Sequence, residues 1–329
     1  MARKKIFLSR IFPETATNIL EDAGFQVISW NKEHPMSYDQ LTKAAQECDA
    51  LFCTLTDKID SSFLNSCSHL DIITQFAVGY DNIAIAEATK LGIPIGYAPN
   101  AMNEATADIT FGLMIATARK MFFMNQKIKD GDWSYFNPVG HLGLELKGKT
   151  LGILGLGRIG LAMAQRCKGA YNMNILYHNR NINPQAEKNL GAKLVDFETF
   201  LSQSDVISVH CALTEETKDI FNKTAFDKMK SNALFINTAR GAVHNEQDLI
   251  KALQQGVIWG AGLDVTNPEP MKAHNPLLTM ENVCVLPHIG SATITARNEM
   301  ARMGAQNIIS FYDRGTVPYI VNPQVLSAS

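Results

Sequence analysis

Two series of short apolar runs, each alternating with helix-like segments, constrain the fold of this 329-residue chain more than any other feature. Strands that are apolar along their whole length need cover on both faces, which is typical of parallel sheets joined by helices. The length allows two domains of ordinary size. The pattern therefore predicts an α/β protein with two doubly wound parallel sheets.

The first series occupies the first hundred residues and is followed by one long expected helix from about 104 to 129. Amphipathic stretches such as Glu14–Ala23 and Tyr38–Glu47 separate its apolar runs, and Gly24 stands in the position of a helix C-cap. The expected strands are Lys5–Ser9, Gln26–Trp30, Ala50–Leu55, Asp71–Ala77 and Pro94–Ala98.

The second series follows that helix, and a further long helix near Thr293–Tyr312 follows its last run. Its six strands fit a Rossmann-type sheet. The tail Tyr319–Val321 is expected to return to the first domain. We therefore predict a discontinuous, flavodoxin-like substrate domain of residues 1–100 and 293–329, into which a Rossmann dinucleotide-binding domain of residues 101–292 is inserted. The expected strands of the second series are Leu151–Leu154, Asn174–His178, Val206–His210, Ala233–Thr238, Gly260–Val265 and Val283–Leu286.

Composition and charge argue against several kinds of partner. The formal net charge is -2, so no basic excess favours nucleic acid or an anionic membrane. No apolar run reaches the ~18 residues of a membrane span, and Met1–Arg10 lacks a signal-peptide core, so a cytoplasmic location is expected. The six cysteines form no CxxC pair and no histidine has zinc-finger spacing, so we expect reduced, mostly buried thiols and no metal site.

A GxGxxG run lies directly after an expected strand and opens an expected helix, which is the context that gives this common pattern its meaning. Gly155 permits the tight turn, Gly157 lets the backbone approach a pyrophosphate, and Gly160 lets helix and strand pack closely. The helix start, which includes Arg158 and Ile159, offers unpaired N–H groups and a positive dipole end to the phosphates. The alternative is a glycine turn in a nucleotide-free α/β fold.

The end of the next expected strand distinguishes the two nicotinamide cofactors. NAD enzymes commonly place Asp or Glu there, about 20 residues beyond the glycines, to bind the ribose 2′-hydroxyl. Here the strand ends in His178, Asn179 and Arg180. No carboxylate repels a 2′-phosphate, and Arg180 is able to pair with one. The sequence therefore favours NADP(H), and NAD(H) stays open if Arg180 is only a solvated loop residue.

Arg240, Glu269 and His288 each follow an expected strand of the second series by a few residues. Ligand crevices of open α/β sheets lie at the carboxyl ends of the strands. All three are therefore candidate catalytic residues facing one ligand. The alternatives are a surface cation for Arg240, a solvated loop carboxylate for Glu269 and a structural cap for His288.

These motifs together resemble those of the D-isomer-specific 2-hydroxyacid dehydrogenase family over nearly the whole chain. Within it, the chain is most similar to the glyoxylate/hydroxypyruvate reductase branch, on the grounds of the strand end without Asp and the run Gly290-Ser291-Ala292-Thr293. The motifs are Val78-Gly79-Tyr80-Asp81-Asn82, the GxGxxG run, Asn237-Thr238-Ala239-Arg240-Gly241, Ala261-Gly262-Leu263-Asp264-Val265, Pro268-Glu269-Pro270 and Pro287-His288-Ile289-Gly290-Ser291-Ala292-Thr293.

The resemblance implies that a small 2-oxo acid, such as glyoxylate or hydroxypyruvate, is reduced by hydride transfer. Arg240 would bind the substrate carboxylate and polarise the carbonyl, and His288 would protonate the carbonyl oxygen. Glu269 would orient His288 and favour its imidazolium form. The backbone N–H groups of Val78 and Gly79 would hold the carboxylate from the other domain.

The resemblance also implies further residues that contact the cofactor and the substrate, and a partner subunit. Asp264 would lie near the nicotinamide, and Ser291 would reach the substrate. A homodimer is implied, built through the long helix after Glu104. The segment Trp133–His141 would shape a substrate pocket or be buried at an interface. The remaining predicted cofactor contacts are Thr106, Cys211, Ala212, Thr238 and Gly290.

Other activities remain as alternatives. A 2-ketogluconate reductase or a D-lactate dehydrogenase would use the same residues. Phosphoglycerate dehydrogenases often carry an extra C-terminal domain, for which this chain has no room, and formate dehydrogenases place Gln where Glu269 stands. A nucleotide-sensing co-repressor is the alternative of a different class, although no partner-binding surface for that role is evident in the sequence.

Overall fold

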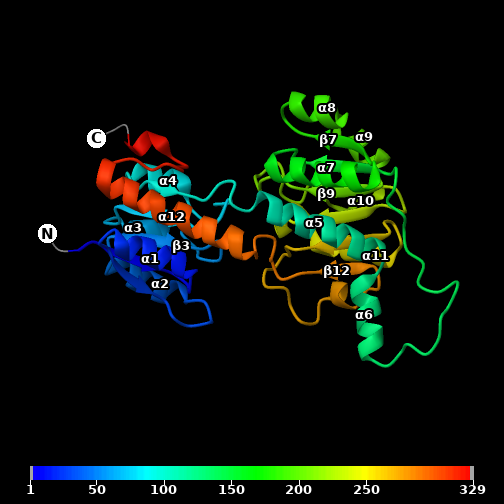
Figure 1. The fold of residues 1–329 in the computed structure, drawn as a ribbon, viewed down its shortest axis with the longest axis horizontal. Helices are drawn as coiled ribbons and strands as arrows, with labels where there is room; N and C mark the ends of the chain where they lie inside the picture. Colours follow the sequence, from blue (N-terminus) through cyan, green and yellow to red (C-terminus); the bar gives the residue numbers. More distant parts are fainter. Residues whose placement is uncertain (1–2, 327–329) are drawn as a thin grey trace. The chain divides into compact units, whose positions relative to one another are not determined.

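The structure is a computed structural model that describes residues 3–326. The chain forms two compact units, one of Met1–Met102 with Ala292–Ser329 and the other of Asn103–Ser291. Each unit contains one sheet, and all of the paired strands in both sheets run parallel (Figure 1). The predicted α/β class with two doubly wound parallel sheets is therefore confirmed.

The sheet of the first unit has the order β2-β1-β3-β4-β5, which is the order of flavodoxin-like sheets. Its strands are β1 (Lys5–Leu8), β2 (Gln26–Ser29), β3 (Ala50–Cys53), β4 (Ile72–Gln75) and β5 (Ile95–Gly96). Its helices are α1 (Glu14–Asp22), α2 (Tyr38–Gln46), α3 (Ser61–Ser66), α4 (Ile85–Lys90), α12 (Ile294–Arg314) and the 3-10 turn η3 (Pro323–Leu326).

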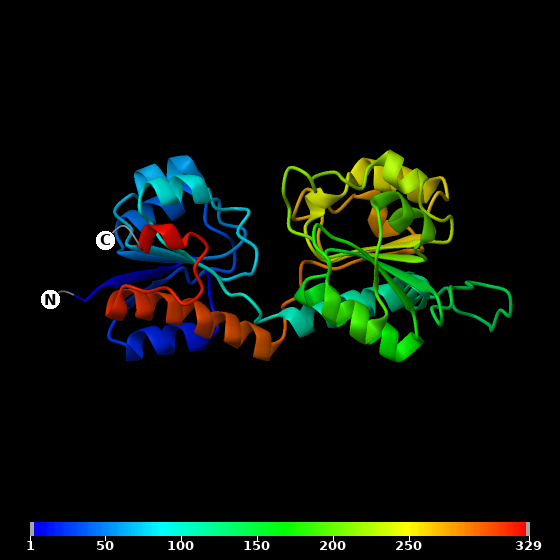
Figure 2. The same ribbon diagram turned by 90° about the horizontal axis from the view of Figure 1, so that it is seen from above.

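Helices cover both faces of this sheet (Figure 2). Successive side chains of a strand point to opposite faces. Ile6 and Leu8 of β1 therefore pack in one apolar cluster with α1 and α12, whereas Phe7 packs in a second cluster with α2, α3 and α4. Burial on both faces explains why the strands are apolar along their whole length.

The end of the described chain returns to the edge of the first sheet. The Tyr97 N–H donates to the Tyr319 carbonyl at 3.0 Å, and the Val321 N–H donates to the Ile95 carbonyl at 2.8 Å. These bonds tie the segment after α12 to β5. The predicted return of the tail to the first domain is therefore confirmed.

The sheet of the second unit has the order β12-β11-β10-β9-β6-β7-β8. Counted from β6, this is the Rossmann order 3-2-1-4-5-6 with β12 added. Its strands are β6 (Thr150–Leu154), β7 (Asn174–His178), β8 (Lys193–Leu194), β9 (Val206–Val209), β10 (Leu234–Asn237), β11 (Gly260–Leu263) and β12 (Val283–Val285). Its helices are α5 (Asn103–Ala118), α6 (Met121–Lys129), α7 (Arg158–Tyr171), α8 (Pro184–Leu190), α9 (Phe197–Gln203), α10 (Lys223–Asp227) and α11 (Glu246–Gln254), with η1 (Gly241–Val243) and η2 (Pro276–Thr279).

Two expectations for the second unit are wrong. The strand β8 was not predicted, because it has only two residues, both exposed, and so forms no apolar run. The single helix expected over 104–129 is two helices, since Lys120 adopts a left-handed conformation (φ 53°) between α5 and α6. A tertiary contact accounts for the break. The Leu144 N–H donates to the Ala118 carbonyl oxygen at 2.9 Å, so this carbonyl is not available to continue α5.

The remaining sequence expectations concern membranes and thiols. Within residues 3–326, no helix is long and apolar enough to cross a membrane. All six cysteines are free thiols, and five of them are buried. Cys211, at the end of β9, is partly exposed, and burial raises the pKa of its thiol to about 11.

Candidate active site

The glycine loop lies between β6 and α7 and closely approaches β9. Gly155 has φ +92°, and a Cβ there would lie 2.6 Å from the Cys211 nitrogen, so only glycine fits. A Cβ on Gly160 would lie 2.5 Å from the Gly155 carbonyl oxygen, whereas one on Gly157 would meet nothing within 4 Å. The loop is therefore tight against the protein at its first and last glycine and open at Gly157.

The start of α7 is suited to an anion. Among the described residues, no side chain caps its N-terminus, where Gly157 is the N-cap residue and Arg158 the first helical residue. Uncapped N–H groups in the first turn, together with the helix dipole, attract phosphate. The exposed Arg158 and the partly buried Ile159 lie in this turn. The open face at Gly157 and this uncapped turn fit the pyrophosphate of a dinucleotide.

The three residues at the end of β7 have different surroundings. The Asn179 side chain accepts the Leu156 N–H at 2.8 Å and so braces the glycine loop. His178 donates from Nδ1 to the Val195 carbonyl at 2.9 Å. Arg180 is exposed, and its charge helps to hold the pKa of the Glu216 carboxyl below its usual range, after the larger effect of a hydrogen bond from Thr214. Arg180 is thus the residue of the three that is presented to solvent.

His288 and Glu269 form a hydrogen-bonded pair. His288 Nδ1 donates to Glu269 Oε1 at 2.5 Å, and the side chains are 20% and 32% exposed. Burial acts to raise the pKa of the Glu269 carboxyl, but the hydrogen bond and charge of His288, with a smaller effect of Arg240, outweigh it and lower the pKa. Glu269 is therefore an anion at neutral pH that accepts the Nδ1 proton of His288, and Nε2 is the ring nitrogen that is not bonded to it.

The backbone that presents His288 is held by Asp264. The carboxylate of Asp264, which follows β11, accepts the Ile289 N–H at 2.8 Å and the Gly290 N–H at 2.7 Å. His288 itself has φ 55°, a conformation that non-glycine residues rarely adopt. Burial raises the pKa of the Asp264 carboxyl against the opposing effect of these two bonds. The predicted nicotinamide contact of Asp264 stays a prediction, whereas its contacts in the structure position the His288 loop.

Arg240 follows β10 and is positioned by Asn237, a residue of the same motif for which the sequence predicted no role. The buried Asn237 donates from Nδ2 to the Arg240 carbonyl at 2.9 Å and to His244 Nδ1 at 3.0 Å, and its Oδ1 accepts the Ala239 N–H. Burial lowers the pKa of His244 to about 4, so its ring is neutral and Nδ1 accepts. Asn237 and His244 thus fix the turn that carries Arg240.

A chain of threonines connects α5 to the strand ends. Thr106 donates to the Gly290 carbonyl at 3.2 Å, and Thr110 donates to the Thr106 carbonyl at 2.7 Å. The hydroxyls of Thr110 and Thr238 are 2.8 Å apart. Three predicted cofactor contacts, Thr106, Thr238 and Gly290, therefore belong to one network, and Thr110 is a further member without a sequence signal.

The other predicted residues divide between the two units. Cys211 and Ala212 follow β9, and Ser291 is buried at the end of the second unit. Val78 and Gly79 belong to the first unit, after β4. Within residues 3–326, their backbone N–H groups donate to no protein acceptor, so they are available to an anion.

A buried glutamine and a partly buried asparagine support the loop that contains Val78 and Gly79. Gln75 donates to the Gly79 carbonyl at 3.2 Å and to Asn82 Oδ1 at 2.7 Å, and Asn82 donates to the Asp57 carbonyl at 2.7 Å. The sequence signal that could have drawn attention to this support is a glutamine, Gln75, inside a mostly apolar expected strand, and the structure shows that its side chain is fully buried.

Comparison with known proteins gives consistent matches. Residues 111–290 match the family model described as D-isomer specific 2-hydroxyacid dehydrogenase, NAD binding domain. The chain is similar to a glyoxylate reductase of Thermococcus litoralis, with 43% identity over 331 residues that cover 99% of each chain.

Solved structures show the same likeness. A glyoxylate reductase from Paecilomyes thermophila matches with a TM-score of 0.86 and 32% identity, over 98% of this chain and 100% of that chain. An NADPH-dependent glyoxylate/hydroxypyruvate reductase from Sinorhizobium meliloti, in complex with NADP and malonate, matches with a TM-score of 0.84 and 27% identity, over 97% of each chain.

Proposed function

Because the chain belongs to the D-isomer specific 2-hydroxyacid dehydrogenase family, whose members are NAD(P)-dependent oxidoreductases, we propose that it reduces glyoxylate and hydroxypyruvate to glycolate and D-glycerate. The observation that carries the proposal is the His288–Glu269 hydrogen bond at the sheet edge that also presents Arg240 and the glycine loop. The relatives named glyoxylate reductase support the choice of substrate.

In this proposal each side chain has a separate role. The Arg240 guanidinium binds the substrate carboxylate, because its planar fork matches two oxygens, and its charge polarises the neighbouring carbonyl. His288 donates the Nε2 proton to the carbonyl oxygen, while Glu269 stabilises the imidazolium until the proton leaves. When bound, a reduced nicotinamide would supply the hydride that the carbonyl carbon receives. The N–H groups of Val78 and Gly79, in the first unit, are proposed as donors to an anionic group.

A substrate panel tests the function. With NADPH as reductant, we expect kcat/KM for glyoxylate and hydroxypyruvate to exceed that for pyruvate and 2-ketogluconate by at least about tenfold, since one methyl or hydroxyl group in a pocket changes discrimination by roughly 10- to 200-fold. Absorbance at the reduced nicotinamide band measures each rate. A higher value for pyruvate or 2-ketogluconate, or no oxidation with any 2-oxo acid, would contradict the proposal.

NADPH is proposed as the preferred cofactor. Arg180 is exposed at the end of β7, and within the described residues it has no ion pair that would hold it away from a 2′-phosphate. We expect Arg180→Ala to lower kcat/KM for NADPH by about 10- to 100-fold, the effect of a lost charge-assisted hydrogen bond, and to leave that for NADH nearly unchanged. Lys193→Ala, which removes an exposed cation of the neighbouring β8, is the matched control. A wild-type preference for NADH would overturn this proposal.

A homodimer is proposed on the apolar segment that follows α6. Five large apolar side chains in this segment are at least 68% exposed, and Figure 1 shows the segment looping away from the sheet of its unit. Exposed apolar patches of this kind mark interaction surfaces. None of the residues of α6 is buried either. The five residues are Trp133, Tyr135, Phe136, Val139 and Leu142. The expected cytoplasmic location stays a prediction.

Light scattering coupled to size exclusion measures the assembly. We expect a dimeric mass for the wild type, and a monomeric mass for the double variant Trp133→Ser/Phe136→Ser, because exposed apolar area drives the association. Ile294→Ser removes a side chain of the first unit that is 85% exposed, and it should leave the dimer intact. A monomeric wild type at micromolar concentration would refute the dimer.

A further inference from the structure

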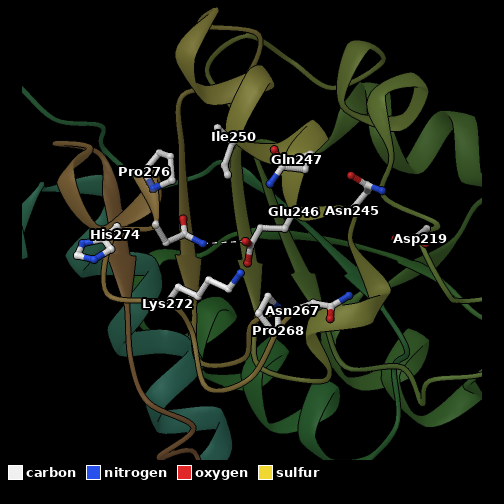
Figure 3. Close-up of a pocket in the computed structure, with 11 residues that line it drawn as sticks. Asp219, Asn245, Glu246, Gln247, Ile250, Asn267, Pro268, Lys272, His274 and Pro276 are labelled. Atoms are coloured by element: carbon white, nitrogen blue, oxygen red, sulfur yellow. Dashed lines mark hydrogen bonds between the residues drawn. The ribbon is translucent and has the colours of Figure 1, made fainter.

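A cavity of about 460 Å³ lies in the second unit between the first turn of α11 and the loop that leads to η2 (Figure 3). Arg240, Glu269 and His288 are not among its lining residues, although Asn267 and Pro268, which precede Glu269, are. The volume falls in the range of small-molecule sites, roughly 300–1,000 Å³. None of the roles assigned above uses this cavity.

A buried carboxylate with an unpartnered oxygen lines this cavity. Glu246, the first residue of α11, is only 8% exposed. Its Oε1 accepts from Asn275 Nδ2 at 2.7 Å, whereas its Oε2 has no hydrogen-bond donor within residues 3–326. A buried carboxylate oxygen without a donor is costly, and such atoms in folded proteins are nearly always satisfied. A hydrogen-bond donor from a ligand, most favourably a cationic group, would therefore stabilise Glu246 Oε2.

The charges around the cavity have both signs. Asp219 and Glu246 contribute carboxyl groups to its lining, and the exposed Lys272 contributes an ammonium group. The exposed His274 also lines it. Lys272 forms no ion pair within the described part of the chain, and Figure 3 shows both it and Glu246 facing the cavity. A ligand with a positive and a negative group close together would match both kinds of side chain, whereas a simple cation would leave Lys272 unmatched.

We propose that this cavity binds a small zwitterion of the α-amino acid type. The ligand ammonium group donates to Glu246 Oε2, and the ligand carboxylate pairs with Lys272. The amide of Asn275 keeps the Glu246 carboxylate in place, because it donates to Oε1 and its own Oδ1 accepts the Leu277 N–H at 3.0 Å. This inference concerns binding alone and does not depend on the proposed reaction.

Glycine binding to the full chain, measured by calorimetry and by the rise in Tm at constant ionic strength, tests the proposal. A ligand that binds only the folded state raises Tm. We expect Glu246→Gln and Lys272→Met each to weaken glycine binding at least about tenfold, since each removes one charge-assisted contact. Ethanolamine, which has the ammonium group but no carboxylate, should bind more weakly than glycine and should not respond to Lys272→Met.

Two controls separate this site from others. Glu198→Gln changes an exposed glutamate in the first turn of α9 and should leave glycine binding intact. Arg240→Ala should also leave it intact, which distinguishes the cavity from the carboxylate site proposed for the reaction. Lys272 is exposed, so Lys272→Met keeps the test valid if Glu246→Gln fails to fold. Absence of any glycine effect, equal binding of glycine and ethanolamine, or unchanged glycine binding in Lys272→Met would overturn the proposal.

Discussion

His288→Ala is expected to lower kcat for the reduction of glyoxylate by about 10²- to 10⁴-fold, the usual contribution of a positioned general acid. The reason proposed is that His288 Nδ1 donates to Glu269 Oε1 at 2.5 Å, which makes Nε2 the proposed proton donor. Steady-state rates with saturating NADPH measure the loss. The affinity for NADPH, followed by quenching of protein fluorescence, should stay nearly unchanged, since His288 lies outside the glycine loop.

The pH profile provides the control for this variant. Wild-type reduction should slow as pH rises, because the reduction consumes a proton that is proposed to pass through the His288–Glu269 pair. The residual activity of His288→Ala should lack this dependence. The pKa of Glu269 is lowered, so its carboxylate is ionised throughout the neutral range and does not itself produce the alkaline fall. A variant that keeps both its rate and its alkaline fall would remove His288 from the mechanism.

Arg240→Ala is expected to lower kcat/KM by about 10²- to 10³-fold, with effects on both kcat and KM. Loss of a charge partner of a bound carboxylate costs roughly 2–5 kcal/mol, and loss of carbonyl polarisation adds to the effect on kcat. Arg240→Lys should recover only part of the activity, because an ammonium group does not reproduce the planar fork. Steady-state kinetics of both variants, which give kcat and KM separately, measure these effects.

Arg166→Ala is the matched control for the charge change. Arg166 lies on α7 of the same unit, where it pairs with Glu104 at 2.8 Å and with Asp108 at 2.7 Å. Loss of these largely exposed ion pairs should change stability slightly and kcat/KM hardly at all. A similar loss of kcat/KM in both variants would show that Arg240 acts through general charge and not through the substrate.

The sequence carried local information that proved reliable. Apolar runs such as Lys5–Leu8 located the strands, because burial on both faces imposes a composition that reads directly from the chain. The glycine run predicted a tight turn, and the structure shows that this turn lies so close to Cys211 that it leaves no room for a Cβ at Gly155. Arg240, Glu269 and His288 could be identified as one candidate set because the carboxyl ends of parallel strands share an edge.

Other features depended on contacts between distant segments. The break of the expected long helix follows from a bond between Leu144 and Ala118, and nothing in the local sequence at Lys120 requires it. The two bonds that Asp264 accepts from the His288 loop, and the contacts of Asn237 with Arg240 and His244, likewise involve polar residues whose partners cannot be read from spacing.

The sequence by itself determined the α/β class, the two parallel sheets and the identity of the candidate catalytic residues, since each follows from periodicity or from a short motif. Only the tertiary structure decided the strand orders, the 2.5 Å contact that joins Glu269 to His288, and the cavity that leaves Glu246 Oε2 without a donor. The physical reason is that hydrogen bonding and burial between segments far apart in the chain depend on how the elements pack, which local composition does not encode.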